Sequence, residues 1–96
     1  MLSYEKLSTE QIAAESQTVP QWRVDGVLIR EYQFPSYKDG LVFAVAVGHL
    51  ADTLNHHPDI FIGYQKVTVS MVTHDAGGGL TAYDFELARR IDRLGT

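Results

Sequence analysis

Three of the four histidines in this 96-residue sequence stand where a side chain could take part in proton transfer. His56 and His57 are adjacent and precede Pro58, and His74 is expected to end a strand beside a flexible loop at residues 75–79. An imidazole pKa near 6.5 lets one ring donate a proton while another accepts one at neutral pH. Two histidines in unlike environments could therefore act as an acid–base pair, without a metal or a nucleophile.

A carboxylate precedes the histidine pair at helical spacing. Asp52 and His56 are four residues apart, so on a helix their side chains would share one face and could touch. His56 would lie in the last helical turn, where the helix dipole favours a protonated ring. His57 precedes Pro58, which forces it out of the helical region, so the two adjacent rings should point in different directions.

Each of these residues also has a purely structural interpretation. His56 suits a helix C-terminus, His74 could simply end its strand, and Asp84 has the spacing of a capping acid early in a helix. Three histidines could also bind a divalent ion. Adjacent histidines rarely chelate one metal, however, and the chain has no cysteine, so we expect no metal and no cofactor. The glycines at 77–79 are not followed by lysine and do not form a phosphate loop.

Helix start signals occur near both ends of the chain. Ser8 and Gln11 form a capping box, and this first helix should end before Pro20. Thr81 and Asp84 repeat the signal for the last helix. Four apolar residues should bury that helix: Leu87, Ala88, Ile91 and Leu94.

A middle helix is predicted from Tyr37 to about Asn55, capped by Ser36 and stopped by Pro58. Its apolar positions recur at helical spacing at Leu41, Val42, Val45 and Ala46.

Four strands are predicted around this middle helix. Asp25-Gly26 is a hairpin turn between strands at 22–24 and 27–34. A short apolar strand at 60–62 precedes an alternating strand at 66–74. The order α-β-β-α-β-β-α predicts an α+β two-layer domain, with a four-stranded antiparallel sheet and three helices on one face. We expect one domain over residues 1–96, and an open sheet face that favours dimerisation.

The composition excludes several classes of function. A net charge of −4 and a pI near 5.4 give no basic surface for direct nucleic-acid binding. The longest apolar stretch is too short to span a membrane, and the N-terminus lacks the features of a signal peptide. We therefore expect a cytoplasmic protein that binds neither nucleic acid nor a membrane directly.

The spaced pattern of these residues resembles the signature of the pterin-4a-carbinolamine dehydratase family. That signature comprises an acidic residue, a His-His-Pro motif, an aromatic residue, a histidine at a strand end and an aspartate early in the last helix. In this sequence the corresponding residues are Asp52, His56-His57-Pro58, Tyr64, His74 and Asp84. The resemblance extends over most of the chain.

The resemblance implies conversion of 4a-hydroxytetrahydropterin to quinonoid dihydropterin and water, in recycling of tetrahydrobiopterin, by a homodimer or homotetramer. It assigns His56 and His74 to proton transfer, His57 to holding the pterin and Asp52 to orienting His56. The side chains that it places against the substrate are Asn55, Thr73, Asp75 and Asp84.

Two departures from the family pattern leave substrate preference open. Ile60 stands where animal members carry tryptophan, and the loop at 75–79 is one glycine longer than in many bacterial relatives. The resemblance also carries a second hypothesis, a non-catalytic dimerisation or assembly cofactor of a partner protein. Such a role would not need the histidines, so the intact set favours the enzyme.

Overall fold

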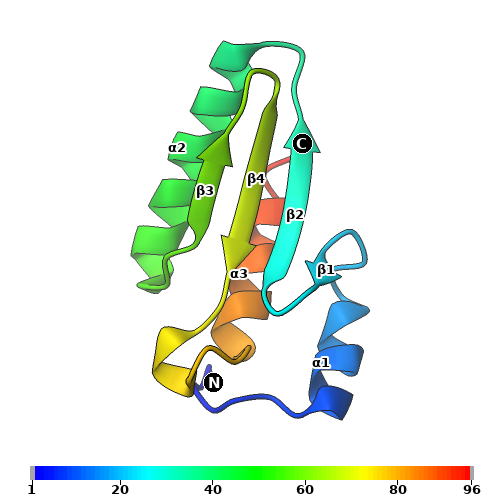
Figure 1. The fold of residues 1–96 in the computed structure, drawn as a ribbon. Coiled ribbons are helices and arrows are strands. Elements are labelled where there is room, and N and C mark those ends of the chain that lie inside the picture. Colours follow the sequence, from blue (N-terminus) through cyan, green and yellow to red (C-terminus); the bar gives the residue numbers. More distant parts are fainter. Residues whose placement is uncertain (1, 96) are drawn as a thin grey trace.

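The computed structural model describes residues 2–95 and has the element order that the sequence predicts (Figure 1). The elements are α1 (Thr9–Ser16), β1 (Arg23–Val24), β2 (Leu28–Gln33), α2 (Tyr37–Leu54), β3 (Asp59–Ile62), β4 (Lys66–Met71), the 3-10 helix η1 (His74–Ala76) and α3 (Ala82–Asp92).

The four strands form one antiparallel sheet in the order β1-β2-β4-β3. The predicted hairpin at Asp25-Gly26 is confirmed, and β3 and β4 form a second antiparallel pair. β2 pairs with β4 along its whole length, from Leu28 opposite Met71 to Gln33 opposite Lys66. The two central strands, β2 and β4, are therefore far apart in sequence, and the short strands β1 and β3 lie at the edges of the sheet. This arrangement confirms the predicted α+β fold.

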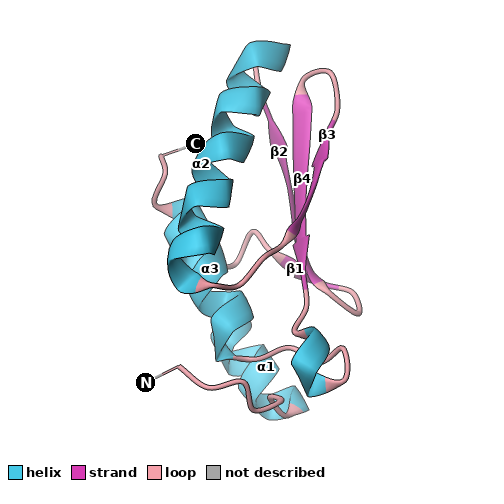
Figure 2. Ribbon diagram, turned by 90° about the vertical axis from the view of Figure 1, so that its left-hand side faces the viewer, coloured by secondary structure: helices cyan, strands magenta, loops and turns pink. Residues whose placement is uncertain are grey.

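The helices make the second layer of the domain. In Figure 2, α2 and α3 lie along one side of the sheet, and none of the three α-helices covers the opposite side. Arg89 of α3 bonds Glu15 of α1 at 2.8 Å, which ties α1 to the helical layer. Gly40 lets α2 approach β4 closely, because a Cβ atom there would lie 3.2 Å from Val67. The buried core between the layers comprises Val19, Trp22, Leu28, Tyr32, Phe43, Val47, Ala51, Val67, Val69, Met71, Leu80, Phe85, Leu87, Ala88 and Ile91.

Both predicted capping boxes are present. Gln11 N donates to Ser8 Oγ at 3.1 Å, and the Gln11 side chain accepts from Ser8 N at 2.8 Å. At α3, the Asp84 side chain accepts from Thr81 N at 2.9 Å. The local signals therefore fixed where these two helices begin.

The predicted buried face of α2 is wrong. Val42 and Val45 are 61% and 62% exposed, and Leu41 is also exposed, whereas Phe43 and Val47 face the core. Apolar residues occur on almost every side of this helix, so two different faces have apolar residues at helical spacing. Packing against β4 selects the face that carries Gly40 and Phe43. Leu94 was also expected to be buried, but it lies beyond the end of α3 and is 36% exposed.

The predicted strand at 66–74 is three residues too long. β4 ends at Met71, and the next residues form a compact turn rather than a plain flexible loop. Thr73 N donates to Gly79 O at 3.0 Å, and η1 lies between these two residues. Gly77 and Gly78 have φ values of 66° and 83°, which glycine adopts without strain. This turn places His74 at the start of η1 instead of at a strand end.

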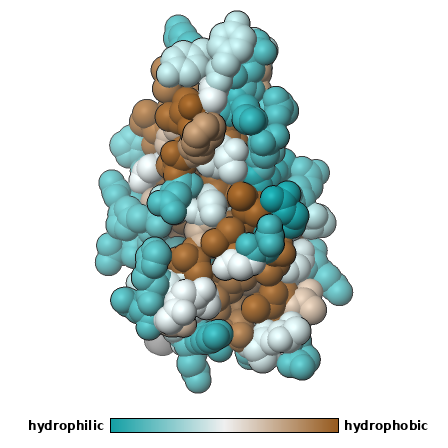
Figure 3. All heavy atoms as spheres, viewed as in Figure 1, coloured by the Kyte–Doolittle hydropathy of each residue, from teal (hydrophilic) through white to brown (hydrophobic). Residues whose placement is uncertain are grey.

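The open side of the sheet is largely polar. β2 and β4 present Glu31, Gln33, Lys66, Thr68 and Ser70 on this face, together with Ile29, which pairs with Ser70. Phe61 of β3, which pairs with Thr68 and is 64% exposed, lies on the same face. Hydrophobic atoms interrupt this polar surface in the view of Figure 3. Within residues 2–95, no helix is both long enough and apolar enough to cross a membrane.

Candidate active site

The C-terminus of α2 turns His56 into the protein. Asn55 adopts a left-handed conformation, with φ 52° and ψ 45°, and ends the helix. His56 N then donates back to Ala51 O at 3.0 Å, which satisfies one of the last helical carbonyls. The result is a histidine that lies beyond the helix rather than in its last turn. Its side chain is only 7% exposed.

The buried partner of His56 is Asp84. His56 Nε2 lies 2.6 Å from Asp84 Oδ1, and Asp84 is fully buried. The other carboxyl oxygen, Oδ2, accepts from Thr73 Oγ1 at 2.8 Å and from Thr81 N at 2.9 Å. Thr73 gives its one hydroxyl proton to Asp84, so the 2.9 Å bond between the two threonine hydroxyls is donated by Thr81. Asp84 therefore both caps α3 and holds His56.

This network fixes which nitrogen of His56 can exchange protons. A carboxylate only accepts hydrogen bonds, so the bond to Asp84 requires that Nε2 carries hydrogen. No described residue hydrogen-bonds Nδ1, and every fully buried side-chain N or O atom of the described residues has a partner. Nδ1 is therefore not fully enclosed, and it is the nitrogen that a ligand could reach.

The expected contact between Asp52 and His56 is wrong. Asp52 Oδ1 instead lies 2.9 Å from His57 Nε2, and these side chains are 78% and 59% exposed. The spacing of four residues implied a contact only if His56 were helical. Because α2 ends at Leu54, His56 turns inward and His57 takes the position beside Asp52.

His74 and Asp75 begin η1, and both are exposed. His74 directly follows Thr73, whose hydroxyl bonds Asp84, and Asp84 in turn bonds His56. This chain of contacts brings the segment of His74 to the segment of His56 and His57. Asn55 is exposed at the end of α2, in the same turn as the histidine pair.

Sequence reasoning missed two aromatic residues at this site. The Tyr83 ring lies 5.8 Å from the His56 ring, and Tyr4 stacks on Tyr83 with ring centroids 4.0 Å apart. Tyr83 could have been suspected, because it directly precedes Asp84 in the first turn of α3. Tyr4 gave no signal, since it is nearly a whole chain away from Tyr83 and belongs to no predicted element.

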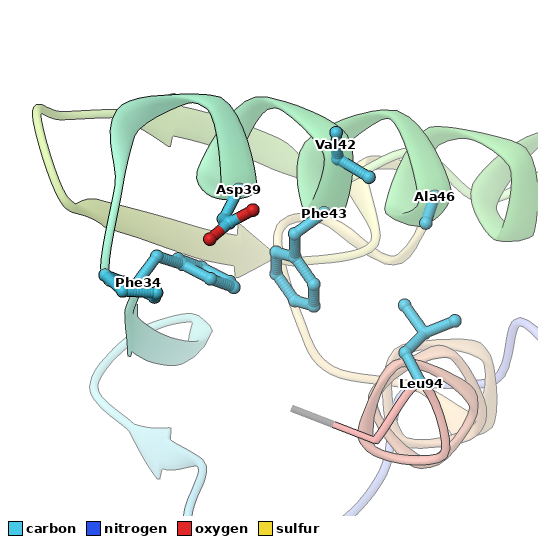
Figure 4. Close-up of a pocket in the computed structure, with 7 residues that line it drawn as sticks. Phe34, Asp39, Val42, Phe43, Ala46 and Leu94 are labelled. Carbon is cyan, nitrogen blue, oxygen red and sulfur yellow. The ribbon is translucent and has the colours of Figure 1, made fainter.

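Two hollows border α2. One contains His57 and Asp52, together with His49 and the aliphatic side chains of Val45 and Ile60. The other, of about 350 Å³, lies against the N-terminal half of α2 (Figure 4). It is lined by Phe34, Pro35, Asp39, Val42, Phe43, Ala46 and Leu94, none of which the sequence marked for chemistry.

The metal-binding alternative gains no support from the side-chain positions. Among residues 2–95, no three His, Asp or Glu side chains come together in a way that could hold a metal ion.

The fold and this site define a class of protein. It is a small two-layer α+β domain in which a His-His-Pro turn after the central helix meets a buried aspartate of the last helix. The sequence model of the pterin 4 alpha carbinolamine dehydratase family matches residues 5–94 of this chain. The chain belongs to that family, as its residue pattern indicated.

Relatives in distant organisms match over nearly the whole chain. A protein of Roseiflexus sp. (strain RS-1), described as a candidate pterin-4-alpha-carbinolamine dehydratase, is 43% identical over 90 residues, which cover 93% of this chain and 96% of the relative. A protein of Sulfurisphaera tokodaii with the same description is 41% identical over 90 residues, again 93% of this chain and 96% of the relative.

Two solved structures share the fold. A transcriptional coactivator/pterin dehydratase from Brucella melitensis superposes with a TM-score of 0.87 at 25% identity, covering 96% of this chain and all of that one. A pterin dehydratase-like protein, described as a RuBisCO assembly factor in the alpha-carboxysome, gives a TM-score of 0.60 at 23% identity. That alignment covers 76% of this chain and 84% of the other, and the likeness concerns the fold alone.

Proposed function

We propose that this protein dehydrates 4a-hydroxytetrahydropterin to quinonoid dihydropterin by acid–base catalysis between histidines. The observation that carries the proposal is the buried bond between His56 and Asp84, which orients one imidazole and leaves its Nδ1 accessible. The second oxygen of this carboxylate is held by Thr73 and Thr81, so Asp84 and the His56 ring are fixed in position. Membership of the dehydratase family supplies the substrate class.

The reaction needs one proton delivered and one removed. The hydroxyl at C4a takes a proton and leaves as water with its bonding electrons, while the neighbouring N–H loses a proton and its electron pair forms the new C=N bond. We assign delivery to His56, because the Asp84 carboxylate balances the positive charge of a doubly protonated ring. We assign removal to His74, which is exposed and makes no side-chain hydrogen bond to a described residue. The protons balance, so the reaction needs no redox partner.

The other predicted site residues would hold the substrate. His57, fixed by Asp52, borders a hollow whose other walls include Val45 and Ile60. A mostly apolar hollow with a few polar groups suits a flat heterocycle. We also assign Asn55, Thr73 and Asp75 to the pterin site, as the family resemblance implies. Thr73 acts through Asp84 as well, because its hydroxyl is bonded to that carboxylate.

We also propose assembly into a homodimer or homotetramer. Val42 and Val45 are mostly exposed on α2, with Leu41 beside them, which is an unusual apolar surface for a monomer of this size. The open sheet face, which first suggested assembly, carries mainly polar side chains. The outer face of α2 is therefore the better supported contact surface.

The names of two structural neighbours include a protein-assembly or coactivator role. A non-catalytic cofactor role would not need an accessible Nδ1 on a histidine that is oriented by Asp84, so catalysis remains our first proposal.

The test is turnover of freshly generated carbinolamine by the pure protein, with a chelator present. We expect loss of water well above the spontaneous rate, unaffected by the chelator. A rate equal to that of buffer alone would exclude the proposed activity.

A further inference from the structure

An aromatic pair lies directly beside the candidate acid. The rings of Tyr4 and Tyr83 stack with centroids 4.0 Å apart and an interplanar angle of 12°. The Tyr83 ring is also the neighbour of the His56 ring, at 5.8 Å and a tilt of 37°. Tyr83 is partly buried, whereas Tyr4 is 42% exposed. Tyr4 is thus the outer ring of the pair and Tyr83 its support.

The segment before α1 is fastened to the loop that follows η1. Leu7 N donates to Leu80 O at 2.8 Å, which joins the two segments through the backbone. Lys6 lies against Gly79, where an added Cβ atom would come within 2.7 Å of the Lys6 side chain. Gly79 therefore permits a close approach that another residue would obstruct. These two contacts hold Tyr4 beside the site.

The surroundings of the Tyr4 ring also act on its phenol group. Partial burial raises the pKa of the Tyr4 phenol above its usual value, and the nearby groups of Tyr83 and Asp75 add to this rise. Asp75 directly follows His74. The phenol therefore stays neutral at pH 7, and its ring stacks on the Tyr83 ring next to His56.

We propose that Tyr4 is a specificity-determining residue, whose exposed ring, backed by Tyr83, packs against the flat bicyclic ring of the pterin. This inference rests on the proposed function, because it takes the pterin as the ligand. A flat aromatic ligand gains affinity from a parallel aromatic ring. The hollow beside His57 has the aliphatic Ile60 and Val45 in its walls and, among residues 2–95, no Phe, Tyr or Trp side chain.

The test is the affinity for a stable, fully oxidised pterin such as biopterin, measured by fluorescence titration. Tyr4→Ala should raise the dissociation constant roughly tenfold, within the range known for loss of one base–aromatic stack. Tyr4→Phe keeps the ring and should stay within about twofold of the unmodified protein. Tyr37→Ala is the matched control, because Tyr37 is 49% exposed at the opposite end of α2. Its affinity should not change.

Thermal melting of the variants should coincide with that of the unmodified protein, which excludes unfolding as the cause. Unchanged or tighter binding by Tyr4→Ala would overturn the inference, and tighter binding would mean that Tyr4 covers the site. The inference is also overturned if the unmodified protein does not bind the oxidised pterin.

Failure of the inference can be told apart from failure of the proposed function. A protein that binds the pterin through Tyr4 but does not dehydrate the carbinolamine would retain the inference and lose the function. If the protein dehydrates the carbinolamine and the Tyr4→Ala variant has the same KM as the unmodified protein, the function is retained and the inference is overturned.

Discussion

Asp84 is the residue on which the candidate site depends. Its two oxygens accept from three donors, namely the Thr73 hydroxyl, the Thr81 backbone N–H and His56 Nε2, at 2.6 to 2.9 Å. Burial makes each of these bonds costly to lose, because water cannot replace the missing partner. The same carboxylate thus sets the start of α3 and the orientation of the candidate acid.

Replacing Asp84 with asparagine should therefore affect stability and catalysis together. The amide NH2 group must face either His56 Nε2–H or the donors from Thr73 and Thr81, which leaves a donor without an acceptor. We expect the free energy of unfolding to fall by about 1–3 kcal/mol. We expect kcat to fall by about 10², because His56 loses its fixed orientation. Urea denaturation and steady-state kinetics measure the two effects.

Asp52→Asn is the comparison for this variant. Asp52 and His57 are both exposed, so the free energy of unfolding should change by less than about 1 kcal/mol. Any kinetic effect should be on KM, through His57. A large loss of kcat in Asp52→Asn, with near-native kcat in Asp84→Asn, would show that the carboxylate roles are reversed.

The sequence predicted which residues gather here better than how they pair. The motif grouped the histidines with Asp84 and Thr73, and in the structure hydrogen bonds join His56, Asp84 and Thr73. The predicted contact between Asp52 and His56 is wrong because Asn55 has a left-handed backbone conformation. This conformation directs His56 inward instead of along the helix. Nothing local in the sequence separates these two geometries, because either leaves His57 ahead of Pro58.

At the scale of elements, ion pairs reinforce the contact between α1 and α3. Arg90 Nε donates to Glu86 Oε2 at 2.8 Å, and Arg89 bonds Glu86 and also Glu15 of α1. The hydrogen bond from Arg90 is the main reason why the pKa of Glu86 lies below its usual value near 4.5, and the bond from Arg89 adds to it. The capping box that begins α3 was readable from four residues, whereas this link between helices was not.

Glu86→Gln should lower stability in a pH-dependent way. The folded-state pKa of Glu86 is depressed, so its charge stabilises the fold above the unfolded pKa near 4.5 and that stabilisation is lost as pH falls through the folded value. We expect a loss of less than about 1 kcal/mol at pH 7, because the groups are partly exposed.

The difference between Glu86→Gln and the unmodified protein should shrink at acid pH, in urea denaturation at a series of pH values. Glu5→Gln is the control, since Glu5 makes no ion pair with a described residue. A difference that stayed constant or grew toward low pH would contradict the ion-pair account.

At the scale of the whole molecule, the outer face of α2 is an apolar surface that the domain does not bury. The helix is apolar on two faces and the sheet covers only one of them. The sequence predicted an open sheet face, which none of the described α-helices covers in the structure, but it did not predict the exposed apolar face of α2. Periodicity could not show which apolar face of α2 packs on β4, since the choice depends on contacts such as that of Gly40 with Val67.

Val45→Lys should dissociate the oligomer. Val45 is 62% exposed, so a charge there is tolerated by the monomer and opposed by an apolar contact between copies. Sedimentation at micromolar concentration should show at least a dimer for the unmodified protein and a smaller species for the variant. Thr68→Lys places the same charge on the open sheet opposite Glu31 and should leave the assembly intact. Dissociation by Thr68→Lys alone would assign the interface to the sheet.

The central claim, that His56 and His74 exchange protons with a pterin carbinolamine, is tested most directly by kcat for freshly generated carbinolamine in single alanine variants. His56→Ala and His74→Ala should each lower kcat by roughly 10²–10⁴, the usual contribution of one positioned acid or base. His57→Ala should mainly raise KM, because His57 holds the ring and does not transfer the proton. Near-native kcat in both His56→Ala and His74→Ala would contradict the account.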